Sequence, residues 1–175
     1  MSMTFHTTVN TRQLDLLKGR LTVLRDKATV VGWPAAGSPL HKVYDSKGAL
    51  TTGHLTVAQT AAVHEFGSPS RNLPARPTMR ETIRVFKRDL PAEVANIYRG
   101  VLRGTTSGEQ ALDYLGGFWE GRVKQIFTRG RWEPLDVRRT IRNRLRRGNT
   151  SMQPMVDSGH LRQTVTHKTV GAGYQ

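Results

Sequence analysis

Residues 64–77, HEFGSPSRNLPARP, contain a His-Glu pair at the end of an apolar run. A zinc site of the H-E-x-x-H type needs a second histidine one helical turn later, so that both imidazoles face one metal ion. That position is Ser68, and no other pair of histidines has ligand spacing; the six are His6, His41, His54, His64, His160 and His167. The chain also has no cysteine. The sequence therefore predicts no metal site and no cofactor.

A second pattern, Asp157-Ser158-Gly159-His160, places an acid, a hydroxyl and an imidazole within four residues. Neighbouring side chains on one short segment point in different directions, whereas a catalytic relay needs groups that converge from distant segments. Asp157 is better explained as the cap of a short helical turn over SGHLR. Because the chain also lacks a G-x-S-x-G motif and a phosphate-binding glycine motif, we expect no enzyme.

The segment RRTIRNRLRR at residues 138–147 carries the highest density of charge. Its arginines are Arg138, Arg139, Arg142, Arg144, Arg146 and Arg147. On a helix they would surround a narrow apolar stripe of Val137, Ile141 and Leu145. Guanidinium groups pair with phosphates and carboxylates, so these arginines are candidates for contact with a nucleic-acid backbone or an acidic partner. A solvated face, or salt bridges between subunits, would explain the same residues.

The net charge of the chain suits a polyanionic partner, and its apolar content limits the size of the hydrophobic core. The chain has 175 residues, which fits one domain, and a formal net charge of +14 from 27 Lys+Arg and 13 Asp+Glu. Such a charge attracts nucleic acid or acidic protein surfaces. Apolar residues make up 37% of the chain, enough for a modest core. No run of about 18 apolar residues occurs, so we expect no membrane-spanning helix.

Hydrophobic spacing in the first part of the chain predicts the elements that must position these residues. We expect a helix at residues 10–26, a strand at 27–33, a loop or β-hairpin arm at 34–53 and a second helix at 55–66. Thr56 would cap the second helix, and Gly67 would end it. A short strand at 40–45 would lie within the arm. The proline-rich residues 68–77 are expected to have no regular structure.

The second part of the chain predicts two long helices, a short helix and a last strand. The long helices are expected at residues 78–102 and 107–128, the short helix from Asp136 onward, and the strand at 163–170. Thr78 with Glu81, and Ser107 with Gln110, have the spacing of capping boxes. Pro91 would kink or split the first long helix.

Together these elements predict an α+β fold in one domain over residues 1–175. Two to three long helices would pack on a small mixed or antiparallel sheet, with residues 34–53 as an extended loop or hairpin arm. Residues 131–175 would form a basic segment followed by the terminal strand. Arg71 and Arg76 stand in the proline-stiffened corner, where an arginine loses little entropy on pairing and suits a fixed salt bridge or an interface contact.

Three segments of the chain resemble a known family. HEFG followed by LPARPTMRETI resembles a segment of tailed-phage neck and tail-completion proteins, the group that includes siphophage minor tail proteins and Mu-type virion morphogenesis proteins. RWEPLDVRRTIRNR and PMVDSGHLRQTVTHKTV are similar to later segments of that family, in the same order. Thr78 stands where the family usually has an aromatic residue, Met155 where it usually has leucine, and Ser158 where it commonly has threonine.

The resemblance implies a non-enzymatic virion component, made in the host cytoplasm and placed at the head–tail junction or tail end. It implies a homo-oligomeric ring of six or twelve copies that contacts other neck, portal-adaptor or tail-tube proteins, with non-specific contact to packaged DNA and none to a membrane. Candidate subunit contacts are Arg71, Pro74, Arg76, Pro77, Arg80 and Trp132. The alternative is a free basic nucleic-acid-binding protein that uses Arg138–Arg147.

Overall fold

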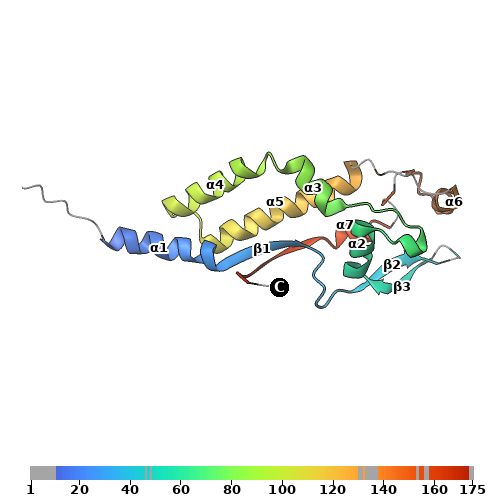
Figure 1. Cartoon of the computed structure of the whole chain (residues 1–175), viewed down its shortest axis with the longest axis horizontal. Coiled ribbons are helices and arrows are strands. Elements are labelled where there is room, and N and C mark those ends of the chain that lie inside the picture. The colour runs from blue at the N-terminus through green and yellow to red at the C-terminus, as the bar shows by residue number, and fades with distance from the viewer. Residues whose placement is uncertain are drawn as a thin grey trace, which may run out of the picture.

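The fold is α+β, as the sequence predicts. The computed structural model describes residues 11–45, 47, 49–129, 132, 138–152, 154–155 and 158–173, except the side chains of Arg71 and Arg139. These residues form an elongated molecule in which the long helix α5 runs beside a two-stranded sheet (Figure 1). Helix α1 lies at one end of the long axis, and helix α6 lies at the other.

The sheet beside α5 joins two strands that are distant in sequence. Strand β1 (Lys27–Gly32) pairs with β4 (Thr166–Gly171) in antiparallel register, from Lys27 opposite Gly171 to Gly32 opposite Thr166. Helix α5 (Gly108–Arg129) packs on both strands. Its start is the predicted capping box, in which the Ser107 hydroxyl accepts from the Gln110 N–H and the Gln110 side chain accepts from the Ser107 N–H.

Three further helices pack along α5. They are α1 (Thr11–Asp26), α3 (Thr78–Phe86) and α4 (Leu90–Arg103). The predicted long helix at 78–102 is split into α3 and α4, because Pro91 has no N–H to continue the helix and instead occupies the first turn of α4. Gly104 ends α4 in the left-handed conformation with φ of 78°.

The predicted hairpin arm is present and forms a sheet of its own. Strand β2 (Leu40–Tyr44) pairs with β3 (Leu50–Thr56) rather than with β1, so the described residues hold two separate two-stranded sheets. The strand expected at 40–45 therefore does not join the sheet beside α5. Helix α2 (Val57–Phe66) follows at once, with Thr56 and Gln59 as a reciprocal capping box.

The core lies where α2, α5 and the segment before β4 meet. Its buried side chains are Val57, Ala61, Val123, Phe127, Leu161 and Val165. The Trp33 ring packs edge-on against Phe127, with ring centroids 5.9 Å apart, and its indole N–H donates to the Leu161 carbonyl at 2.9 Å. Short helix α7 (His160–Gln163) thereby places Leu161 in the core. No helix in the described ranges is long and apolar enough to cross a membrane.

Candidate functional site

Glu65 fixes the corner between α2 and α3. Its carboxylate, 12% exposed, accepts the backbone N–H groups of Met79 at 2.9 Å and Arg80 at 3.1 Å in the first turn of α3. The Arg80 guanidinium pairs with the same carboxylate and also donates to the Glu65 carbonyl oxygen. The end of one helix therefore caps the start of the next, where a negative charge is favourable.

The predicted capping box of Thr78 and Glu81 is wrong. Thr78 is the first helical residue, and Pro77 in the capping position makes no side-chain cap. Thr78 is 2% exposed, and its backbone carbonyl accepts from the Thr82 hydroxyl at 2.7 Å. Because proline offers no side-chain acceptor, two of the orphan N–H groups of α3, those of Met79 and Arg80, are satisfied by Glu65 instead.

The loop of this corner is more ordered than its prolines predict. Residues Pro69–Arg71 form a short 3₁₀ turn, closed by Asn72 with a left-handed φ of 52°, and Ser68 and Leu73 form an isolated β-bridge. Two apolar side chains of the corner stay exposed, Phe66 at 74% and Leu73 at 44%. The predicted contact residues around them differ in burial: Arg80 is exposed, while Pro74 and Pro77 are half-buried.

Two of the predicted contact residues are buried within the chain. Arg76 is 8% exposed, and its backbone N–H donates to the His64 carbonyl at 2.6 Å. Trp132 is 6% exposed. The Arg76 side chain lines a pocket under the corner, so any contact it makes with a partner requires a group that reaches into that pocket.

Helix α6 (Arg138–Arg146) sorts its arginines onto two faces. Arg138, Arg142 and Arg146, spaced four apart, are exposed and form one ridge. Arg144 is only 5% exposed, and the guanidinium of Arg147, just after the helix, lies 4.2 Å from the centre of a tyrosine ring on β2.

The predicted apolar stripe of this helix is not its buried face. Leu145 is 47% exposed, whereas its neighbour Arg144 is buried. Successive residues of a helix are turned by about 100°, so Leu145 does not share the face of Arg144, whereas Ile141, three residues before Arg144, is half-buried. Val137 and the predicted cap Asp136 lie outside the described residues.

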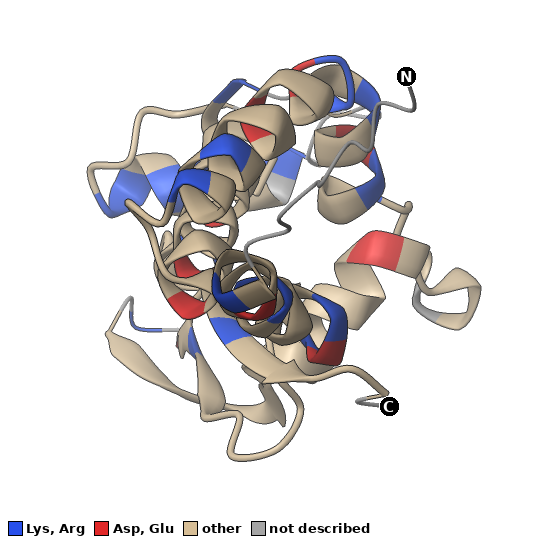
Figure 2. Ribbon diagram, turned by 90° about the vertical axis from the view of Figure 1, so that its left-hand side faces the viewer, with Lys and Arg blue, Asp and Glu red and all other residues tan. Residues whose placement is uncertain are grey.

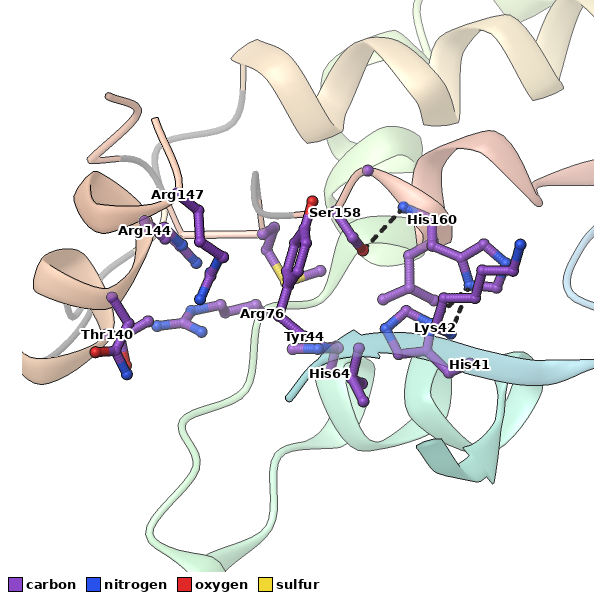
Figure 3. A pocket seen from close by; sticks show the side chains of 15 residues that line it. His41, Lys42, Tyr44, His64, Arg76, Thr140, Arg144, Arg147, Ser158 and His160 are labelled. Atoms are coloured by element: carbon purple, nitrogen blue, oxygen red, sulfur yellow. Dashed lines mark hydrogen bonds between the residues drawn. The ribbon is translucent and has the colours of Figure 1, made fainter. Parts of the chain in front are cut away.

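The corner, α6 and the hairpin enclose a pocket of about 330 Å³ (Figure 3). Arg76 enters it from the corner, Arg144 and Arg147 enter from α6, and the ring of Tyr44 stands between them and the hairpin. One arginine of the corner and two arginines of the basic segment therefore lie in the lining of one pocket. The remaining lining residues are His41, Lys42, Val43, His64, Thr140, Asn143, Met155, Ser158, Gly159, His160 and Leu161.

A pair of histidines joins the hairpin to α7 at the edge of this pocket. The backbone N–H of Lys42 donates to Nδ1 of His160 at 3.1 Å, and Nδ1 of His41 lies 3.1 Å from the same atom. Nδ1 of His160 is therefore an acceptor, and His41 is the donor. Burial, with the charge of His160, lowers the pKa of His41; burial, with the charge of Lys42, lowers the pKa of His160.

The Asp-Ser-Gly-His segment is not arranged as a relay. The Ser158 hydroxyl accepts from the backbone N–H of His160 at 3.3 Å, while the His160 imidazole turns toward His41 and Lys42. Asp157 lies outside the described residues. Within the part of the chain that the structure describes, no group of three or more His, Asp or Glu side chains is placed to hold a metal ion.

A charged cluster that the sequence does not reveal holds β4 on α5. Nδ1 of His167 lies 2.6 Å from a Glu120 oxygen, and its Nε2 lies 3.1 Å from an Asp113 oxygen. The hydrogen bond to Glu120 raises the pKa of His167, opposed by burial and aided by Asp113. The three residues lie up to 54 positions apart, so only the docking of the strand brings them together.

Comparisons with known proteins do not assign this chain to a family. No protein-family model matches the chain. The chain is similar to an uncharacterized protein of Methanocaldococcus jannaschii, 37% identical over 65 residues that cover 34% of this chain and 48% of that protein. The chain thus spans about half the length of the curated relative it matches. No solved structure matches.

Proposed function

We propose that this chain is a structural virion protein that forms or completes the head–tail connector or tail-terminator ring of a tailed phage. The three segments that resemble neck and tail-completion proteins support the proposal. Parts of all three, namely the corner at Arg76, helix α6 at Arg144 and the segment at Leu161, line the same pocket, which fits the structural roles that the resemblance implies. Ring closure would come from repeated contacts between different faces of neighbouring copies.

The corner between α2 and α3 is the observation that carries this proposal. Phe66 and Leu73 are exposed there on a backbone that Glu65 and Arg80 hold in place. The Arg80 guanidinium also lies over the Phe66 ring, 5.5 Å from its centre. A rigid apolar surface loses little conformational entropy when it is covered by a neighbouring subunit, so it favours assembly.

The distribution of apolar side chains over the described residues agrees with a subunit that is covered by neighbours. Fifteen large apolar side chains are exposed, against eleven apolar side chains that are buried in the core. Single exposed apolar residues are normal. Here, however, they extend over both sheets and over every helix from α1 to α6, which suits several contact faces in a ring.

The position of the chain in purified virions tests the proposal. We expect cryo-electron microscopy, with the symmetry around the tail axis left open, to place six or twelve copies at the neck or tail end. Phe66→Ser should lower incorporation into virions, while Phe66→Tyr, which keeps an aromatic ring at this 74% exposed position, serves as the control. Absence of the wild-type chain from virions would overturn the proposal.

A free nucleic-acid-binding protein is the second candidate, and the exposed ridge of α6 is the observation that favours it. Arg138, Arg142 and Arg146 could follow a phosphate backbone. Lys and Arg are also spread over several other elements, so the ridge is one part of a diffuse positive field (Figure 2). If each arginine contacts one phosphate, replacing the three by glutamine should reduce the salt dependence of DNA affinity by about 2.7 in log–log slope.

A further inference from the structure

An apolar groove borders one edge of the sheet beside α5. It lies between β1 and α3, which both pack on α5, and has a volume of about 380 Å³. Thr29 and Val31 line it from β1, and Met79 and Ile83 line it from α3. Ile83 is 58% exposed, so the groove opens to the surface. The helices α4 and α5 add Leu90, Trp119 and Val123 to the lining.

The backbone of β1 has unpaired hydrogen-bonding groups along the same edge. The Ala172 N–H donates to the Asp26 carbonyl at 2.7 Å, and the register places these two residues opposite each other, so they form a hydrogen-bonded pair. Along an antiparallel ladder such pairs alternate with pairs whose N–H and C=O groups point away from the partner strand. Thr29 and Val31 belong to the second kind, because each lies an odd number of residues after Asp26. No other described strand pairs with this edge, so a further strand can add to it.

The helical side of the groove is held in place before any ligand binds. The Arg122 guanidinium of α5 lies 4.6 Å from the centre of the Phe86 ring and 4.9 Å from that of the Phe118 ring. The same guanidinium pairs with Asp89 at 3.6 Å. These contacts tie the end of α3 and the start of α4 to α5. A groove with fixed walls loses little conformational entropy when it is filled.

We propose that this groove binds an extended acidic segment of another protein, which adds to β1 as a third strand. The N–H and C=O groups of such a segment pair with the free edge, and every second side chain enters the groove. The volume is at the low end of the range for ligand pockets, which suits a few side chains of one strand. A two-stranded sheet is also smaller than the common sheets of about four to six strands, so it gains from a further strand.

Charge decides which kind of segment fits. Lys87 is the charged residue among the described residues that line the groove. The carboxylates nearest to it in the chain, Glu81 and Asp89, pair with Arg84 and Arg122. Asp or Glu next to apolar residues in the segment would therefore be favoured. A second copy of this chain, with a net charge of +14, is repelled over most orientations, whereas an acidic protein is attracted.

Selection from a displayed library of heptapeptides tests this inference, with the purified full chain as the target. In the library, apolar residues alternate with Asp, Glu, Thr, Lys or Arg. We expect peptides rich in Asp and Glu to be enriched, and the best of them, labelled with fluorescein, to bind Ile83→Asp at least about tenfold more weakly, because the substitution removes apolar contact and adds a repelling charge. Val85→Asp makes the same change at a 43% exposed position of α3 outside the groove lining, and should alter affinity by less than about twofold.

Two further measurements separate strand addition in the groove from attraction by overall charge. Lys87→Gln should weaken binding by about threefold, whereas Arg88→Gln, at the exposed neighbouring position, should not change it. Methylation of the peptide amides, one at a time, should abolish binding at every second position only, because an added strand directs alternate N–H groups to β1.

Several results would overturn the inference. These are no enrichment over a selection against Ile83→Asp, equal losses for Ile83→Asp and Val85→Asp, or equal effects of amide methylation at all positions. Self-association of the wild type that Ile83→Asp abolishes and Val85→Asp preserves would mean that a second copy fills the groove. Lys87→Gln and the methylated peptides keep the test decisive if Ile83→Asp does not fold. The binding assay does not depend on the virion role.

Discussion

At the scale of single residues, Glu65 has the sequence pattern of one role, in a metal site, and the structural position of another, as a helix cap. Beside His64 it has the sequence pattern that begins a zinc site, yet its two oxygens accept N–H groups of α3 and the Arg80 guanidinium. A carboxylate that is mostly shielded from water and faces a helix N-terminus stabilises the fold. The same contact holds Phe66 in its exposed position at the corner.

Replacing Glu65 should therefore destabilise the chain. We expect Glu65→Ala to lower the free energy of unfolding by about 2 kcal/mol or more, because it removes a helix cap and a charge-assisted pair together. Glu81→Ala is the matched control, since Glu81 pairs with Arg84 three residues along α3 and its loss should cost less than about 0.5 kcal/mol. Urea denaturation measures both, and equal losses would contradict the assigned cap.

At the scale of elements, the fit of β4 against α5 depends on a glycine. A Cβ placed on Gly116 would lie 2.5 Å from the His167 ring and 2.6 Å from the Thr29 hydroxyl, so the helix can approach both strands only without a side chain there. His167 spans this contact and bonds to Asp113 and Glu120 on either side of it. Strand and helix are thus held by close packing and by a charged cluster at the same place.

The neighbouring glycine provides a direct test of this packing. We expect Gly116→Ala to lower the free energy of unfolding by about 1–3 kcal/mol, because the new methyl group forces β1 and β4 away from α5. A Cβ on Gly117 would meet His167 at 3.8 Å, an ordinary contact, so Gly117→Ala should raise stability by up to about 1 kcal/mol through helix propensity. Thermal or urea unfolding of the two variants should show opposite signs; a loss in both would contradict the fit.

Local chemistry explains which elements the sequence could predict. The cap at Thr56, the capping box at Ser107 and the break at Pro91 all act within a few residues, and all three are confirmed. The predicted cap at Thr78 is wrong because its replacement, Glu65, comes from the preceding helix. The pocket was beyond prediction for the same reason: His41 and His160, which meet at its edge, are 119 positions apart.

At the scale of the whole molecule, the hairpin arm is joined to the body by contacts that respond to acid. His160 accepts from the Lys42 N–H and pairs with His41, and the Tyr44 ring lies against Arg147. The pKa values of both histidines are lowered, so each takes up a proton more readily in the unfolded chain. Their contribution to stability is complete above about pH 6.5 and is lost as the pH falls below it.

Acidification should therefore loosen the hairpin arm, β2 and β3, before it unfolds the rest of the molecule around α5. We expect amide hydrogen exchange in β2 and β3, corrected for the intrinsic effect of pH, to be faster at pH 5.5 than at pH 7.5 relative to α5. His160→Gln should reduce this difference. The contribution of His167 to stability has the opposite pH dependence, because its raised pKa gives stability that is lost as the pH rises. The comparison of His160→Gln with the wild type therefore separates the effect of the arm from that of His167. If the ratio of exchange rates in β2 and β3 to those in α5 were the same at pH 5.5 and pH 7.5, the expectation would be contradicted.

The pairing of β1 with β4 also sets the order of events while the chain is being made. β1 leaves the ribosome long before its partner strand β4 and the core residues Leu161 and Val165. Until these residues follow, Val57 and Phe127 lack the side chains that cover them, so apolar surface stays exposed on the nascent chain. The sheet beside α5 and the core next to it therefore form only after β4 has been made.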